Sequence, residues 1–117
     1  MAQDRPSAEE LVEAVRDFLQ ELLPSLKGER QFHARVSIHL LGIVARELRD
    51  GPALDAAEYE RLRRLLGRDG DLDELNRALA SRIRSGTLDD CRREVLNHVR
   101  QTVTDKLQIV NPRYLDD

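Results

Sequence analysis

The chain has 117 residues, of which 40% are hydrophobic, 35% charged and only 3% aromatic. This length suits one domain whose core needs no metal or disulfide, and the near-balanced net charge of -3 argues against nucleic acid and anionic membranes as partners. No apolar stretch approaches the roughly 20 residues that cross a bilayer, and no apolar signal segment opens the chain. We therefore expect a single cytoplasmic domain over residues 1–117. The one cysteine, Cys91, fits a reducing compartment.

The first predicted helix begins after Ser7. Ser7 and Glu10 have the S-x-x-E spacing of a capping box, in which each side chain satisfies a free backbone N–H of the first turn. Apolar residues then recur at three- and four-residue steps as far as Leu22. Pro24 is expected to end this helix, because proline cannot continue the backbone hydrogen bonds.

The second predicted helix follows the link 25–28 and runs to about Asp50, where Gly51-Pro52 is expected to stop it. Its segment 32–49 is apolar on most sides, which is typical of a helix at the centre of a bundle. Polar groups on such a helix must be hydrogen-bonded or paired when they are buried. They are therefore the first place to look for a functional site.

Three more helices are predicted, with glycine, aspartate and threonine marking their ends. One begins at Asp55 and ends at Gly67, the next begins at Asp71 and ends at Gly86, and the last is capped by Thr87 and ends at 111–112. The expected inward face of the last helix comprises Leu88, Val95, Leu96, Val99, Val103, Leu107 and Val110. The sequence thus predicts an all-α protein, a compact bundle of about five antiparallel helices joined by short loops.

Two opposite charges fall on the apolar stripes of the two most apolar helices. Glu47 shares the stripe of Leu40 and Val36, and Lys106 shares that of Val103 and Val99. Both are expected to point inward and to form an ion pair, since either charge alone is expensive to bury. The alternative is that Lys106, near the end of its helix, extends its ammonium group to water.

The three histidines offer few familiar motifs. His33 lies within an apolar sector and is expected to point inward, whereas His39 borders a polar stripe of arginines. Glu94 and His98, four residues apart, have the spacing of a metal-binding pair but are expected to form a surface hydrogen bond. We expect no metal, no cofactor and no catalytic residues.

Three segments carry a family resemblance: RPSAEELVEAVRDFL, FHARVSIHLLGIVARELRDGP and KLQIVNPRYL. Together they resemble an uncharacterised bacterial family of small all-helical proteins, a domain of unknown function. Its genes often lie beside an aminoglycoside-phosphotransferase-like kinase and an acyl-CoA dehydrogenase, which implies an accessory role in acyl or small-molecule metabolism. The shared motifs, at residues 32–36, 106–107 and 111–114, draw attention to His33, Arg35, Lys106, Asn111 and Arg113.

We interpret the chain first as a non-enzymatic accessory or interaction protein, which forms a homodimer or docks on a kinase-like or acyl-CoA dehydrogenase-like neighbour. The alternative is a small anionic-ligand-binding or catalytic protein with a pocket between the helices 29–50 and 88–110. In that pocket Arg35 or Lys106 holds the anionic group and His33 is a general base. A DNA-binding helix-turn-helix over residues 55–85 is disfavoured by the acidic residues at 69–74. The candidate binding residues are His33, Arg35, His39, Glu47, Lys106, Asn111 and Arg113.

Overall fold

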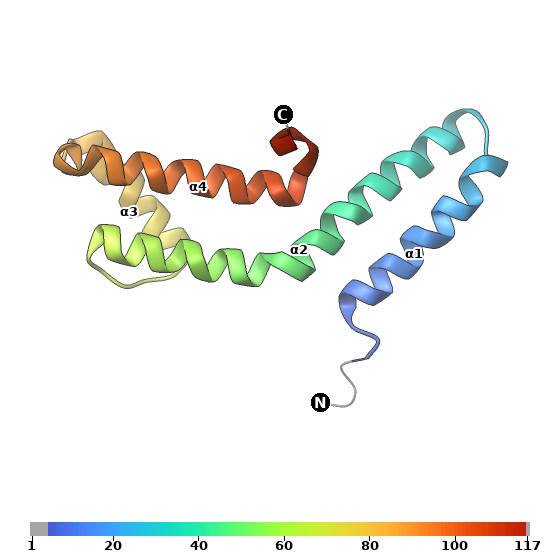
Figure 1. Ribbon diagram of the computed structural model, residues 1–117, viewed down its shortest axis with the longest axis horizontal. Coiled ribbons are helices and arrows are strands. Elements are labelled where there is room, and N and C mark those ends of the chain that lie inside the picture. The colour runs from blue at the N-terminus through green and yellow to red at the C-terminus, as the bar shows by residue number, and fades with distance from the viewer. Residues whose placement is uncertain (1–4, 117) are drawn as a thin grey trace. The chain divides into compact units, whose positions relative to one another are not determined.

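The computed structural model describes residues 5–116 and confirms the all-α prediction (Figure 1). Its elements are α1 (Ala8–Leu22), η2 (Leu23–Ser25), α2 (Gly28–Leu66), α3 (Leu72–Ser85), η3 (Asp89–Cys91), α4 (Arg92–Val110) and η4 (Pro112–Asp116). Within the described residues there is no strand, and none of the helices is long and apolar enough to cross a membrane.

The predicted stop at Gly51-Pro52 is wrong, because α2 passes through both residues and ends only at Leu66. The residue before a proline normally avoids the helical conformation, since its Cβ clashes with the proline ring. Gly51 has no Cβ, so this clash is absent, and what Pro52 still costs the helix is its own N–H and the crowding of its ring against the carbonyl four residues earlier. The helix-ending signal is instead Gly67, whose φ of 66° is left-handed. Over residues 5–116, four α-helices therefore replace the five that were predicted.

The caps of α1 and α3 are confirmed, whereas the predicted cap of α4 is wrong. Ser7 Oγ accepts from Glu10 N at 3.2 Å, and Glu10 Oε1 accepts from Ser7 N at 2.9 Å. Asp71 is the corresponding N-cap of α3. The Thr87 hydroxyl instead bonds to that of Ser85, and the turn η3 separates it from α4. The predicted helix began directly after Thr87 and therefore included the residues that form η3.

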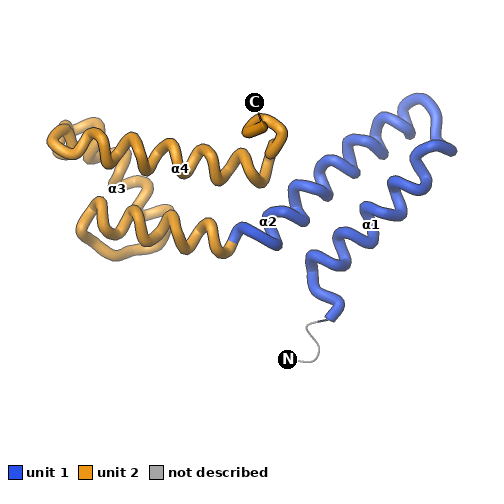
Figure 2. Tube along the Cα trace, viewed as in Figure 1, with its two compact units in different colours: residues 1–51 blue, residues 52–117 orange. Residues whose placement is uncertain are grey.

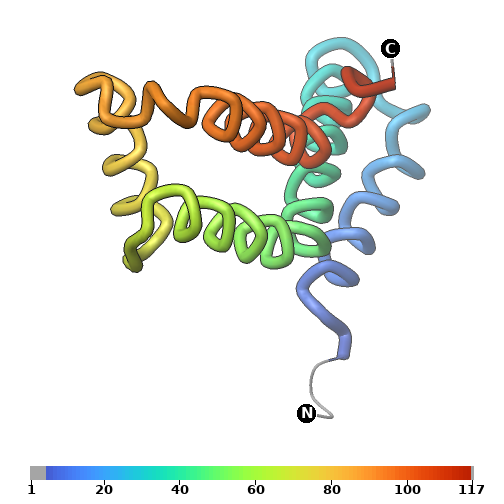
Figure 3. Tube along the Cα trace, turned by 60° about the vertical axis from the view of Figure 1, so that its left-hand side comes forward, coloured from blue at the N-terminus to red at the C-terminus, as the bar shows by residue number. Residues whose placement is uncertain are grey.

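Two compact units divide the chain between Gly51 and Pro52 (Figure 2). The first unit is a hairpin in which α1 runs antiparallel beside the first part of α2 (Figures 1 and 3). Small residues line the side of α2 that is buried there, namely Ala34, Gly42 and Ala45. Arg16 Nε crosses from α1 to the Ile38 carbonyl oxygen at 3.3 Å. The prediction of a single folding domain stays a prediction.

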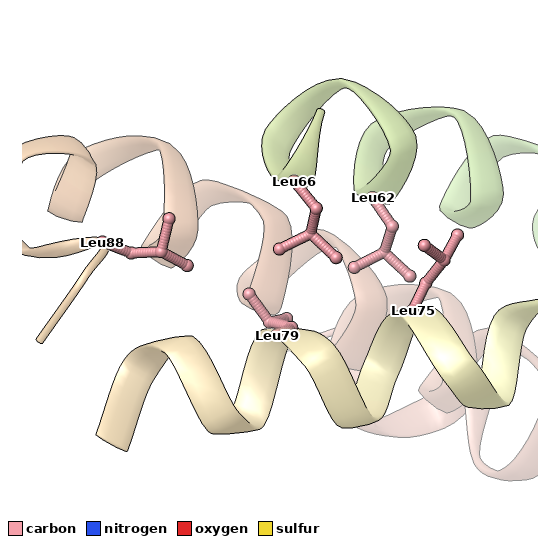
Figure 4. Packing of buried hydrophobic residues seen from close by; sticks show 5 residues of the cluster. All are labelled: Leu62, Leu66, Leu75, Leu79 and Leu88. Carbon is pink, nitrogen blue, oxygen red and sulfur yellow. The ribbon is translucent and has the colours of Figure 1, made fainter. Parts of the chain in front are cut away.

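The second unit has a leucine core between α3 and the second part of α2. Leu62 and Leu66 of α2 face Leu75 and Leu79 of α3, and Leu88 completes the cluster (Figure 4). Leu62 and Leu75 are fully buried. The predicted ends of α3, at Asp71 and Gly86, are confirmed, and Gly86 has the left-handed φ of 81° that closes the helix. This core fixes the second part of α2 as one wall of the unit.

Candidate functional site

All seven candidate binding residues are exposed, and they are divided between the two units. The first unit holds His33, Arg35, His39 and Glu47, and the second holds Lys106, Asn111 and Arg113. The prediction that His33, Glu47 and Lys106 point into a core is therefore wrong. Helical periodicity identified the stripes on which they lie but not what covers those stripes. The Glu47–Lys106 ion pair stays a prediction.

The stripe that carries His33 and Glu47 is an exposed apolar surface of α2. Phe32, at 63% exposure, and Leu40, at 53%, are its most accessible apolar members. We name this surface the α2 stripe, and it comprises Phe32, His33, Val36, Leu40, Val44, Glu47 and Leu48. Glu47 leans along the helix, so that a Cβ added to Gly51 would lie 3.0 Å from its carboxyl carbon.

The other helix of the hairpin also leaves its large apolar side chains in solvent. Phe18 is 59% exposed, and none of the α1 residues Ala8–Leu22 is buried. The exposed apolar residues of α1 are Leu11, Val15, Phe18 and Leu22. The fully buried residues of the hairpin are thus small ones, and large apolar residues such as Leu19, Ile38 and Leu41 are only partly buried. The hairpin therefore lacks the fully buried large side chains of an isolated bundle.

In the second unit α4 turns a partly polar stripe inward. His98, Asp105 and Ile109 are buried, and Val95 and Thr102 are partly buried. The apolar residues that we expected to be buried lie on another side of the helix, where Leu96, Val99 and Val103 are exposed. Lys106 is exposed beside them. The predicted inward face of this helix is therefore wrong for most of its length.

Arg61 of α2 makes the polar stripe of α4 compatible with burial. Its Nε donates to His98 Nδ1 at 3.1 Å and its Nη2 donates to Thr102 Oγ1 at 3.1 Å. Nη2 also lies 3.8 Å from Asp105 Oδ2, and Gln101 donates to the other oxygen of that carboxylate at 2.9 Å. The groups satisfy one another, so the cost of burying each is offset. We name Arg61, His98, Gln101, Thr102 and Asp105 the α4 network.

His98 is held neutral by this arrangement. Since Arg61 Nε–H donates to Nδ1, the imidazole proton lies on Nε2. Burial lowers the pKa of His98 below its ordinary value, and the charge of Arg61 lowers it further against a smaller opposing effect of Glu58. No hydrogen-bond partner is found for Nε2 of His98. Since every fully buried side-chain nitrogen of residues 5–116 has a partner, Nε2 is not fully buried and reaches solvent. The expected surface hydrogen bond of Glu94 with His98 is not found in the described part of the chain.

A groove of about 630 Å³ opens beside the α4 network within the second unit. Arg61, Arg64 and Leu65 of α2 form one side, and α4 and the end of η3 form the other. The lining from the latter two elements is Cys91, Glu94, Asn97, His98 and Gln101. Guanidinium and amide groups and the Nε2–H of His98 make the groove rich in hydrogen-bond donors, which suits an anionic or carbonyl oxygen. In the part of the chain that is described, no group of three or more acidic, histidine or cysteine residues is placed to hold a metal ion.

The burial of His98 has a testable consequence for stability. Unfolding restores the ordinary pKa of about 6.5. As the pH falls through that value, the unfolded chain takes up a proton that native His98 resists, so the free energy of unfolding falls. His98→Gln keeps an acceptor for Arg61 but does not titrate. Urea unfolding at about pH 7.5 and about pH 5 should therefore show a smaller loss in His98→Gln than in wild type.

The control for this measurement is His39→Gln, because His39 is exposed. Its loss of stability between the two pH values should equal that of the wild type. An equal loss in His98→Gln and in wild type would contradict a neutral, buried His98.

The comparison with protein families decides the relationship of the chain. Residues 24–114 match the family described as Domain of unknown function (DUF6285). The chain belongs to this family. The DUF6285 match begins within η2, covers α2, α3, η3 and α4, and ends within η4, so it includes both the α2 stripe and the groove. No curated protein and no solved structure gives a significant match to the chain.

Proposed function

We propose that this DUF6285 protein is a non-enzymatic interaction domain that binds another protein chain through the exposed apolar surface of its α1–α2 hairpin. The observation that carries the proposal is the size of this surface, to which both helices contribute large side chains between 36% and 63% exposed. Soluble monomers rarely leave extended apolar patches in water, and such patches mark interaction sites. Moving a side chain of this size from full exposure to full burial contributes about 1.5–3 kcal/mol, so each of these half-exposed side chains contributes roughly half of that. Several of them must therefore be covered together to offset the cost of association.

The hairpin itself gives a second reason to expect a partner. Its fully buried residues are two alanines and two glycines, which bury little apolar area compared with leucine or phenylalanine, and its leucines and isoleucines are at most partly buried. Two helices with so small a core gain most of their stability from packing on something else. A partner on the exposed surface would supply what the hairpin lacks.

The accessory role and its setting are part of the same proposal. The family resemblance favours an association with a phosphotransferase-like kinase or an acyl-CoA-metabolising enzyme of a bacterial cell. Cys91, a free and partly buried thiol, fits the reducing cytoplasm. The exposed surface of the hairpin could accept a second copy of this chain as well as such an enzyme.

The test compares the wild type with Val15→Glu/Phe18→Glu, in which two exposed apolar residues of α1 become charged. Each chain is analysed alone by sedimentation velocity and after co-expression with the neighbouring kinase and dehydrogenase. We expect the wild type to self-associate or to retain one of these enzymes, and the variant to lose that association by at least about tenfold. A wild type that is monomeric and retains neither enzyme would overturn the proposal, as would an association that neither this variant nor Leu40→Glu weakens.

A second candidate function, binding of a small anionic ligand, is favoured by the groove in the second unit. The donor-rich lining contains two arginines against one glutamate. Acyl-CoA thioesters, nucleotides and sugar phosphates are the probes for a thermal-shift assay, with Arg64→Ala as the variant. A shift that Arg64→Ala abolishes supports this function, and the absence of any shift contradicts it.

A further inference from the structure

The α2 stripe is arranged symmetrically about Leu40. Val36 and Val44 lie four residues on either side of it, and Phe32 and Leu48 lie eight residues on either side. Residues at four-residue spacing form a ridge along a helix, and helices pack by fitting the ridges of one into the grooves of the other. When two copies of α2 cross antiparallel about a twofold axis at Leu40, a residue that follows Leu40 in one copy lies level with the residue that precedes Leu40 by the same number of positions in the other. Val36 of each copy then lies nearest Val44 of the other, while Phe32 and Leu48, which are turned further around the helix from Leu40, lie at the edges of the contact.

The polar members of the stripe distinguish this pairing from others. His33 and Glu47 each lie seven residues from Leu40, on the same side of the helix as Leu40. An antiparallel pair therefore places His33 of each copy opposite Glu47 of the other. The imidazole donates an N–H to the carboxylate whether it is neutral or protonated, so neither group is left without a partner when the surface is covered. Parallel pairing would instead place Glu47 opposite Glu47.

We propose that the occupant of the α2 stripe is a second copy of this chain, paired antiparallel about Leu40, with two His33–Glu47 contacts across the interface. This inference rests on the proposed function and specifies its partner. An interface of this kind uses the same patch on both copies and closes on itself, which is the rule for symmetric dimers. The apolar residues provide the affinity, while the two polar contacts fix the direction and register of the helices.

The experiment exchanges the charges of the polar pair in separate chains. In His33→Glu two carboxylates face each other at both contacts of the homodimer, and in Glu47→Lys a lysine faces His33 at both. A mixed dimer of the two variants has one contact between the introduced glutamate and the introduced lysine, and one native His33–Glu47 contact. We expect each variant alone to dimerise at least about tenfold more weakly than the wild type, and their mixture to recover the wild-type affinity within about threefold. Native mass spectrometry with one chain isotopically labelled measures the mixed dimer.

Asp17→Lys is the matched control, since Asp17 is an exposed charge of the same hairpin outside the apolar stripes. Mixing it with His33→Glu leaves one contact between two carboxylates, so this mixed dimer should stay weaker than the wild-type dimer. If His33→Glu and Glu47→Lys weaken the dimer but do not recover on mixing, the pairing is wrong. If neither variant changes the dimer while Val15→Glu/Phe18→Glu abolishes it, the pairing is also wrong and the interaction domain stands. If the wild type is monomeric alone and binds only a different protein, a second copy is not the occupant.

Discussion

If the proposed dimer forms through the α2 stripe, Leu40→Glu should weaken it by at least about 100-fold. Leu40 lies at the centre of the α2 stripe, so the substitution acts on both copies and removes two buried leucines. It also places two carboxylates against each other on the twofold axis, where water is excluded. Leu40 is 53% exposed, so the fold of each chain should tolerate the change.

The control for Leu40→Glu is Ile83→Glu, because Ile83 is a similarly exposed apolar residue, at 47%, on α3 of the second unit. Sedimentation velocity should give a monomer for Leu40→Glu and the wild-type dimer for Ile83→Glu. Far-UV circular dichroism verifies that both variants keep their helices. Equal dimerisation of the two variants would show that the α2 stripe is not the interface.

Arg61→Ala is expected to lower the free energy of unfolding by about 3 kcal/mol, because it breaks the α4 network from its centre. Asp105, which is 9% exposed, loses its cation, and His98 Nδ1 and Thr102 Oγ1 lose their donor. The neighbouring Arg64→Ala removes the same charge from an exposed position and should cost less than about 0.5 kcal/mol.

Urea unfolding of both variants measures the difference, and a double-mutant cycle of Arg61→Ala with Asp105→Asn isolates the contribution of the ion pair. The two losses should fail to add, since each substitution removes the same contact. Additive losses, or equal effects of Arg61→Ala and Arg64→Ala, would contradict a central role for Arg61.

Local signals predicted the helix boundaries where a single residue determines the backbone. The Ser7–Glu10 box, the Asp71 cap and the left-handed glycines at 67 and 86 are all found where their sequences indicate. Gly51-Pro52 misled because the two signals cancel: glycine relieves the steric conflict that proline imposes on the preceding residue. A short 3-10 turn before α4 likewise gave no periodic signal of its own.

The burial of helix faces could not be predicted from apolar periodicity alone. On α4 the stripe with Leu96, Val99 and Val103 is the more apolar, yet the stripe with His98, Thr102 and Asp105 is turned inward. Arg61 decides this, because one arginine from a sequence-distant helix satisfies all three polar residues. The seven-residue spacing of Cys91, His98 and Asp105 indicated a common face of α4. It did not indicate burial, because two of these three residues are polar.

The same reasoning explains why His33 and Glu47 were predicted to lie among apolar residues but were wrongly expected to be buried. His33 and Glu47 do lie among apolar residues, as their spacing indicates, but those residues are exposed in the hairpin. A stripe that a second chain covers has the same sequence pattern as a stripe inside a core. Apolar periodicity cannot distinguish these two kinds of stripe. The exposed fractions of Phe32 and Leu40 show that the α2 stripe is not inside the core of this chain.

The molar mass of the purified wild-type chain tests the proposed self-association most directly. Light scattering across about a hundredfold range of concentration should give twice the chain mass of 13.4 kDa, falling toward the monomer only at the lowest concentrations. A constant 13.4 kDa over the whole range would contradict the dimer through the α2 stripe.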